Sequence, residues 1–149
     1  MERSGLSLRR LLVALDHGGC RIFENMSCLS KGNVEIIQKT MSDLSLVQQA
    51  ELVSSTAIFV TVCGGGAVSA TFLPKGASLF VFFHDEEGKN GRPVRLDWDY
   101  LNHLGYVRTH WIPRPKQTKE PGSTLGPTEI DFDAFVRLMD HELDIISHL

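Results

Sequence analysis

The segment from Ala57 to Val81, AIFVTVCGGGAVSATFLPKGASLFV, decides the fold that the sequence predicts. Two short runs within or overlapping it, Ala57–Val62 and Ser78–Phe83, are rich in β-branched and aromatic residues, as is typical of buried strands. Between them, three glycines precede a short segment that a proline and another glycine close. The order predicted is therefore a strand, a glycine turn, a short helix and a second strand.

Three consecutive glycines at the end of a strand are costly, because glycine loses more backbone entropy on folding than any other residue. Gly64, Gly65 and Gly66 allow several backbone N–H groups and the N-terminus of a helix to point at one place. Such a place suits a phosphate or another anion. A second interpretation stays open, in which the glycines only form a tight turn between strand and helix.

The composition is that of an ordinary globular protein. The chain has 149 residues, of which 42% are hydrophobic and 22% are charged, so it is long enough for one domain with a core. Its 15 Lys and Arg residues against 18 Asp and Glu residues give a net charge of -3 without a basic run, which argues against partners such as nucleic acid or a membrane surface. No apolar run approaches a membrane span, and Leu11–Leu15 is too short for the core of a signal peptide.

The cysteines and histidines lack the spacing of a metal site. Cys20, Cys28 and Cys63 are an odd number without a CxxC pair, which argues against a structural zinc site and against a disulfide scaffold. The histidines are dispersed along the chain. We therefore expect no bound metal.

Strand-like and helix-like segments alternate along the chain. This alternation predicts an α/β fold with a mainly parallel, Rossmann-like sheet and flanking helices. We expect one domain over residues 1–149, with a core over 11–112, a loop or linker over 113–128, and an amphipathic helix over 129–149 that docks on the sheet. The other expected strands are Leu11–Leu15, Val34–Gln38 and Tyr106–Trp111; the other expected helices are 22–29, one capped by Ser42 or Asp43 that runs to about Ser54, and 96–101, with Asp97 as a possible cap.

Part of the dinucleotide-binding pattern GxGxxG is present in the glycine turn. Gly64 and Gly66 occupy its first two positions, Ser69 replaces the third glycine, and Asp85 or Glu86 follows about 20 residues on. Against this pattern, a proline ends the helix after about two turns, whereas a crossover helix is usually longer. A module that binds a nucleotide or dinucleotide stays open as an alternative.

A thiol-based site is a further alternative. Cys63 lies where a nucleophile elbow places its attacking residue, and Asp97 or Asp99 followed by His110 would complete the order nucleophile, acid, histidine. Thr61 replaces the first glycine of the elbow. A cysteine at a strand end is more often a small buried hydrophobic residue.

The segment around the glycine turn resembles the C-terminal part of the glycosyltransferase family 61 proteins. In that family a helix with Gln or Glu-Gln precedes a strand, a turn of the type His-Gly-Ala-Gly-Leu-Thr-Asn, and then Phe-x-Pro-x-Gly. This chain has Gln48-Gln49 in the helix, Cys63–Ser69 in the turn and Phe72–Gly76 after it, without a gap. Arg21 and Asn25 also match an Arg-x-x-Asn segment of the family, so that the resemblance covers residues 21–83 and, more loosely, 96–111.

The resemblance implies a GT-B-type architecture of two Rossmann-like halves, of which this chain holds mainly the C-terminal, donor-binding half. Members of the family transfer a sugar from a nucleotide-sugar donor to a glycan or glycoprotein acceptor, commonly in the secretory pathway (ER and Golgi) and usually without a metal. We therefore expect a glycosyltransferase that uses a nucleotide sugar as co-substrate and has no other cofactor.

The expected site residues follow from this reading. Arg92, in a polar loop, is a candidate contact for the diphosphate, and Asp97 and Asp99 are candidates for the base that deprotonates the acceptor hydroxyl. A solvated loop charge for Arg92 and a helix cap for one aspartate stay open. The expected donor-binding turn consists of Cys63, Gly64, Gly65, Gly66, Ala67, Val68 and Ser69.

The chain departs from the family pattern at three positions. Cys63 replaces the usual histidine, Ser69 stands where Asn is common, and Val81 stands where Glu is often found. A cysteine is no cationic hydrogen-bond donor to a phosphate. A truncated or inactive relative of the family is therefore a third hypothesis.

Overall fold

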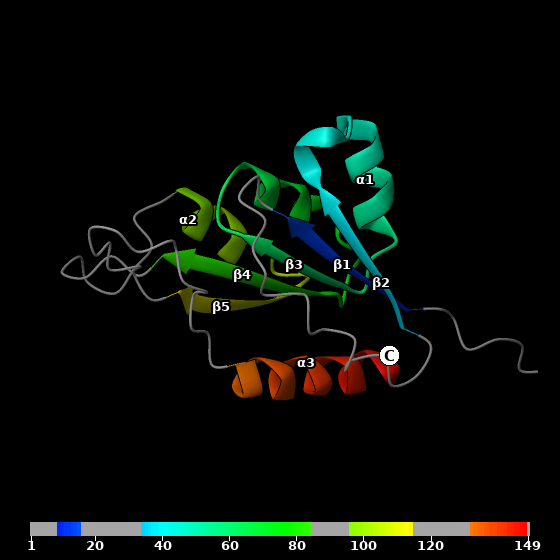
Figure 1. Cartoon of the computed structure of the whole chain (residues 1–149), viewed down its shortest axis with the longest axis vertical. Coiled ribbons are helices and arrows are strands. Elements are labelled where there is room, and N and C mark those ends of the chain that lie inside the picture. Colours follow the sequence, from blue (N-terminus) through cyan, green and yellow to red (C-terminus); the bar gives the residue numbers. More distant parts are fainter. Residues whose placement is uncertain (1–8, 16–33, 85–95, 115–131, 149) are drawn as a thin grey trace, which may run out of the picture.

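A computed structural model describes residues 9–15, 34–84, 96–114 and 132–148. Figure 1 shows a sheet with helices on both of its faces. The elements are β1 (Arg9–Leu15), β2 (Val34–Thr40), the 3₁₀ helix η3 (Met41–Asp43), α1 (Leu46–Ser54), β3 (Ile58–Val62), the 3₁₀ helix η4 (Gly65–Phe72), β4 (Ser78–His84), α2 (Leu96–Asn102), β5 (Arg108–Arg114) and α3 (Phe132–Ser147).

The described strands form one five-stranded sheet in the order β2-β1-β3-β4-β5, and every neighbouring pair is parallel. The predicted α/β fold with a parallel, Rossmann-like sheet is thereby confirmed. The chain moves outward from β1 to β2 and then returns to β3 on the other side of β1. This reversal places the topological switch point of the sheet between the carboxyl ends of β1 and β3, where ligands of open α/β sheets bind.

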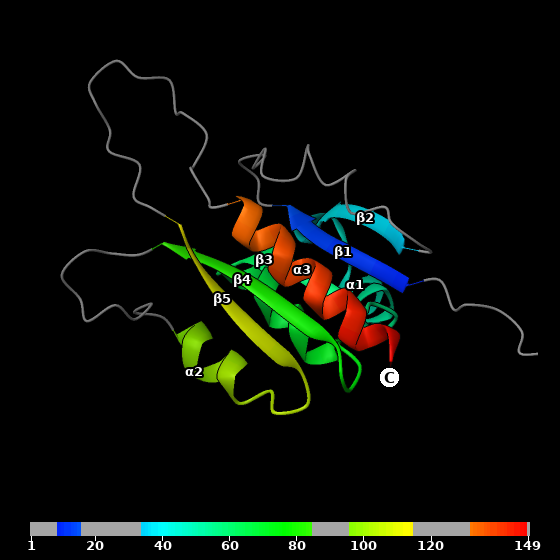
Figure 2. The same cartoon turned by 90° about the horizontal axis from the view of Figure 1, so that it is seen from below.

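Helices cover both faces of the central strands, as Figures 1 and 2 show. On one face, α1, α2 and η4 pack over Phe59 and Leu79; on the other, α3 packs over Ile58 and Phe80. All four of these side chains are fully buried. Because neighbouring residues of a strand point to opposite faces, a strand covered on both faces needs an unbroken apolar run, which is the pattern that predicted β3 and β4.

The start of α1 differs from the prediction. Ser45, and neither Ser42 nor Asp43, caps the helix: its hydroxyl accepts a hydrogen bond from the backbone N–H of Gln48, whose side chain in turn accepts one from the N–H of Ser45. The earlier residues form η3 instead, because Met41 turns into the core with 4% of its surface exposed. The helix ends at Ser54, as predicted.

Two elements after β4 also differ from the prediction. Strand β5 begins two residues later than predicted and extends through Pro113 to Arg114. Among the described strands it pairs with β4 alone and is therefore an edge strand, a position that tolerates proline. Tyr106 lies before the strand, where its carbonyl oxygen accepts a hydrogen bond from the N–H of Gly76. Asp97 is the second residue of α2, so the cap proposed for it is wrong.

The predicted C-terminal helix forms as α3 and docks on the sheet through Phe135 and Met139. The predicted helix over 22–29 and the part of the predicted linker after Arg114 lie outside the described residues. Among the helices that the structure does describe, none is long and apolar enough to cross a membrane.

Candidate functional site

The glycine turn follows β3 directly and lies at the switch point of the sheet (Figure 1). Gly64 has φ 149° and ψ -167°, a backbone conformation that is essentially restricted to glycine. The 3₁₀ helix η4 begins with the next residue. The predicted order of strand, glycine turn, short helix and strand is therefore confirmed, with a 3₁₀ helix in the place of an α-helix.

Gly65 and Gly66 are not required by the turn itself. Neither has a positive φ. A Cβ added at Gly65 would meet no atom within 4 Å, and one added at Gly66 would lie 3.8 Å from the side chain of Met41, an ordinary van der Waals contact. The tight-turn interpretation explains Gly64 but leaves the two following glycines without a reason.

The bare backbone of these two glycines lies at the N-terminus of η4. The N–H of Ala67 donates to the carbonyl oxygen of Gly64 at 2.9 Å, which is the first hydrogen bond within the turn. The N–H groups of Gly65 and Gly66 precede this bond, in the part of a helix where N–H groups have no partner within the helix. Gly65 is exposed. The turn thus combines an accessible backbone with the positive end of a helix dipole.

The side chain of Gln49 ties this turn to the helix before it. Its Nε2 donates to the carbonyl oxygens of Met41, at 2.9 Å, and Leu44, at 3.0 Å, and its Oε1 accepts from the hydroxyl of Ser69 at 2.5 Å. Ser69 is buried, with 4% of its surface exposed. The predicted site residue Ser69 therefore lies in the turn, with its hydroxyl directed at Gln49.

The remaining residues of the predicted turn have different surroundings. Cys63 is half-buried and packs on the cluster beneath α1, and its N–H continues the ladder to β4 by donating to Phe82 at 2.8 Å. Ala67 is buried, whereas Val68 is an exposed apolar side chain with 51% of its surface accessible. A turn with one buried and one exposed apolar residue presents a surface of mixed character beside the glycines.

The predicted acidic residues lie on α2, which packs beside η4 on the same face of the sheet (Figure 1). Asp99 is exposed, and its backbone carbonyl oxygen contacts Nδ1 of His103. Asp97 lies one position past the start of the helix. Arg92 lies outside the described residues.

The alternative that joins Cys63 to His110 is wrong. His110 lies in the middle of β5, opposite Phe80, and its ring is 4.8 Å from that of Phe80 between centroids, on the face that α3 covers. Cys63 follows β3 and packs on the other face of the sheet. The sheet separates the two side chains, so that they cannot form a nucleophile and base pair.

Sequence reasoning missed a buried polar cluster beneath α3. Glu142 is 2% exposed, and its carboxylate accepts hydrogen bonds from Ser78 and from Nε of Arg108, at 2.7 Å, while Nε2 of His110 lies 2.9 Å away. Burial acts to raise the pKa of Glu142, but the hydrogen bonds from Ser78 and Arg108 and the positive charge of Arg108 outweigh it, so the pKa lies below its ordinary value. The helical spacing could have predicted the burial of Glu142, because it lies on the same face of α3 as three apolar residues that pack in or against the core: Phe135, Met139 and Ile146.

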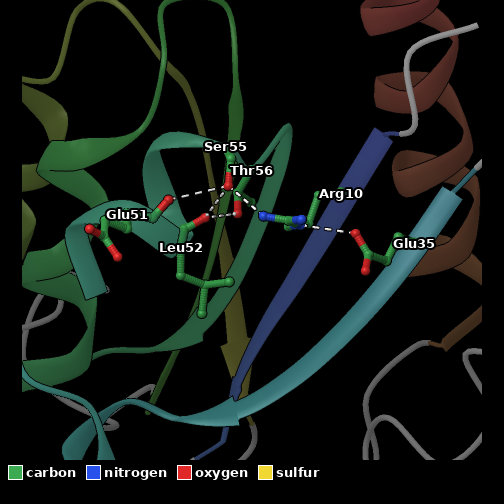
Figure 3. A network of polar contacts seen from close by, with 6 residues as sticks. All are labelled: Arg10, Glu35, Glu51, Leu52, Ser55 and Thr56. Atoms are coloured by element: carbon green, nitrogen blue, oxygen red, sulfur yellow. Dashed lines mark hydrogen bonds and ion pairs between the residues drawn. The ribbon is translucent and has the colours of Figure 1, made fainter. Parts of the chain in front are cut away.

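A second network, shown in Figure 3, joins β1, β2 and the end of α1. Nε of Arg10 donates to the carboxylate of Glu35 at 3.0 Å, and its Nη1 donates to the hydroxyl of Ser55 at 2.5 Å. The positive charge lies at the C-terminus of α1, where the helix dipole favours it. Both this network and the Glu142 cluster lie at the amino ends of the strands, whereas the glycine turn lies at their carboxyl ends.

The comparisons with known proteins agree with the fold. The chain is similar to the solved structure of a flavodoxin-like domain from a Synechococcus sp. protein, with 14% sequence identity and a TM-score of 0.51; the match covers 91% of this chain and 94% of that one. No protein-family model matches the chain, and no curated protein matches it. The strand order 2-1-3-4-5 is that of flavodoxin-like folds, so the class that the structure defines is a parallel, doubly wound α/β protein.

Proposed function

We propose that this protein is a glycosyltransferase-like protein that transfers a sugar from a nucleotide-sugar donor to a glycan or glycoprotein acceptor. Its chain supplies the donor-binding half, and the turn from Gly64 to Ser69 binds the diphosphate of the donor. One observation carries the proposal: within the glycine triplet the backbone conformation requires glycine only at Gly64, yet Gly65 and Gly66 leave a bare backbone at the switch point. A ligand that approaches the backbone closely accounts for both extra glycines.

The arrangement around the turn supports the resemblance to glycosyltransferase family 61. The glutamine of the helix and the end of the turn, which are separate motifs in the sequence, contact each other through Gln49 and Ser69. The last glycine of the Phe-x-Pro-x-Gly segment, Gly76, has a φ of 85°, a conformation that other residues rarely adopt. Among the described residues, those of the helix, the turn and the Phe-x-Pro-x-Gly segment therefore lie next to one another, beside the exposed Gly65.

The proposed chemistry is suited to this unit. A nucleoside diphosphate leaves with negative charge on its phosphate oxygens, and backbone N–H groups at a helix N-terminus stabilise such charge without a metal. In this proposal Asp97 or Asp99 accepts the proton of the acceptor hydroxyl, and Arg92 contributes positive charge to the diphosphate. Cys63 lies immediately before the glycines and takes the place of the family histidine.

The strand order favours a second candidate, a nucleotide-binding module without transferase activity. Flavodoxin-like sheets bind the phosphate of a nucleotide cofactor at the same switch point. Binding of NAD in a thermal melt, with no binding of UDP or GDP sugars, distinguishes this candidate from the first. An inactive relative of the family is the third candidate, and recovery of donor binding by Cys63→His identifies it.

The variant Gly65→Val tests the proposal, because a Cβ at this position meets no atom of the fold within 4 Å, whereas a side chain there would block a phosphate bound to the backbone. We expect the purified protein to bind UDP or GDP sugars in calorimetry, and Gly65→Val to weaken that binding about tenfold or more, or by about 1.4 kcal/mol. Gly105→Val is the matched control, since a Cβ at Gly105 also meets no atom within 4 Å. The proposal is wrong if the protein shows neither nucleotide-sugar binding nor sugar transfer, or if both variants bind equally well.

A further inference from the structure

Gln49 is the side chain that joins three segments around the glycine turn. Its amide uses both N–H bonds of Nε2, toward the carbonyl oxygens of Met41 and Leu44, and its Oε1 accepts from Ser69. A side chain of this length that donates two hydrogen bonds from one nitrogen and accepts one at a neighbouring oxygen must carry a primary amide. The arrangement therefore specifies glutamine at this position.

The contacts of Gln49 close a ring that contains the turn. Ser69 connects Gln49 to η4, and Gln49 connects back to Met41 in η3. Met41 is buried, and its Cβ and Cγ lie 3.8 Å from the position that a Cβ would take at Gly66. Gly66 thus lies between the chain that leads to Ser69 and the side chain of Met41, and Gln49 is hydrogen-bonded to both of these residues.

Glycine needs such an external restraint when its backbone has a binding role. A glycine backbone has more accessible conformations than any other, and N–H groups act on a ligand only when they are held in place beforehand. The restraint comes from the face of the turn that lies toward η3 and α1, where Met41 and Ser69 are buried, while Gly65 stays exposed. Gln49 acts on the turn without occupying the exposed side.

We infer that Gln49 is a positioning residue, which acts through Met41 and Ser69 to hold the N–H groups of Gly65 and Gly66 toward the phosphate of a nucleoside diphosphate. This inference rests on the proposed function and adds a residue to that site. The nucleoside diphosphate contacts the glycine backbone, and Gln49 does not contact it. Loss of Gln49 therefore weakens binding by loosening the turn rather than by removing a contact.

The test compares Gln49→Met, which keeps the length of the side chain but makes none of the three hydrogen bonds, with Gln48→Met. Gln48 is the neighbouring residue of α1 and is exposed, and its side chain accepts a hydrogen bond from the N–H of Ser45 in the helix cap. The probes are UDP and GDP, measured by calorimetry at a temperature well below the melting point of each variant. We expect Gln49→Met to weaken binding about tenfold, because the turn is no longer held by the three hydrogen bonds of Gln49, and Gln48→Met to leave it unchanged.

Amide hydrogen exchange supplies a second readout. We expect the N–H of Ala67, which donates to the carbonyl oxygen of Gly64, to exchange faster in Gln49→Met than in Gln48→Met. A purely structural Gln49 would lower the melting temperature and leave the affinity of the folded protein for UDP and GDP unchanged, which would overturn the inference. If Gln49→Met does not fold, Ser69→Ala removes one of the three bonds and must weaken binding for the inference to stand.

The two proposals fail in different ways. If the unchanged protein binds UDP or GDP and Gln49→Met binds it equally well, the positioning role is wrong and the donor site stands. If the unchanged protein binds neither UDP, GDP nor their sugars, the donor site is wrong, and the role of Gln49 in it is wrong with it.

Discussion

Glu142 shows how single residues fix the position of α3. Its carboxylate lies in the core with 2% of its surface exposed, and it contacts the first residues of two neighbouring strands, Ser78 and Arg108. Arg108 also donates to the hydroxyl of Ser78 at 2.9 Å. Because a buried carboxylate is costly unless its oxygens are bonded, this cluster allows one placement of the helix on the sheet.

The lowered pKa of Glu142 predicts a dependence of stability on pH. A carboxyl group whose pKa is lower in the folded state than the ordinary value of 4.5 stabilises the fold above that value, and this stabilisation is lost as the pH falls through the folded pKa. We expect Glu142→Gln to lower the free energy of unfolding at pH 7 by about 1–3 kcal/mol and to flatten its decline below pH 4.5. Urea unfolding at a series of pH values measures both effects.

Glu51→Gln is the control for this prediction. Glu51 is exposed on α1, so its variant should stay within about 0.5 kcal/mol of the unchanged protein at pH 7 and follow the same decline in acid. Equal pH profiles for Glu142→Gln and the unchanged protein would show that the cluster does not contribute to acid sensitivity.

At the scale of single residues, the sequence predicted the roles that depend on neighbouring residues and missed the roles that depend on partners far away in the chain. Three glycines in a row are visible without a structure, because few other residues adopt the conformation of Gly64. The partners of Glu142 lie 64, 34 and 32 positions away in the chain, and its helix carries other acidic residues that look alike in sequence. Only the docking of the helix distinguishes the buried glutamate from the exposed ones.

At the scale of elements, α1 connects the core to the glycine turn. The helix is short, runs from Leu46 to Ser54, and begins with a capping box formed by Ser45 and Gln48. Its first residues contact the core little, since Leu46 and Val47 are 68% and 66% exposed. The cap therefore contributes a large part of the stability of its first turn, the turn that precedes Gln49.

Ser45→Ala should lower the free energy of unfolding by about 0.5–2 kcal/mol, because it leaves the N–H of Gln48 without the acceptor that now satisfies it. Asp43→Ala is the matched control: Asp43 is exposed in η3, and its variant should change the free energy by less than about 0.5 kcal/mol. Urea denaturation followed by circular dichroism measures both. A larger loss for Asp43→Ala than for Ser45→Ala would contradict the assigned cap.

The two central strands were predicted more accurately than the start of α1, for a physical reason. A strand buried on both faces needs an unbroken apolar run, so its sequence shows where it lies; Ile58–Val62 and Ser78–His84 are both within one residue of the predicted bounds. A helix start depends on which of several Ser or Asp residues has its side chain free to cap. In this chain the burial of Met41 decided between them, and burial is not visible in sequence.

At the scale of the whole molecule, the described residues form a sheet with helices on both faces, and the two ends of its strands carry different features. The edge at the strand beginnings carries the Arg10 and Glu142 networks, which hold helices to the sheet. The opposite edge carries the exposed glycine turn at the switch point. In open α/β sheets ligands bind outside the carboxyl ends of the strands at a switch point, which is where the glycine turn lies. The sequence could place the turn after a strand, but the strand order that puts it at the switch point required the structure.

A chain shortened after residue 131 tests whether the fold depends on both covers. Within the part of the chain that the structure describes, α3 alone covers the face that carries Ile58, Val60, Phe80 and Phe82, all of them fully buried. Its removal would expose a contiguous apolar surface and leave Arg108 without the carboxylate of Glu142.

We expect the shortened chain to lose cooperative thermal unfolding and near-ultraviolet circular dichroism, and a synthetic peptide of residues 132–149 to restore both. The same peptide with Glu142→Ala should restore them only at a concentration about tenfold higher, which corresponds to about 1.4 kcal/mol, because it keeps the apolar side chains of α3 but leaves Arg108 without the carboxylate of Glu142. Cooperative unfolding of the shortened chain at an unchanged midpoint would show instead that the face beneath α3 is stable without its helix.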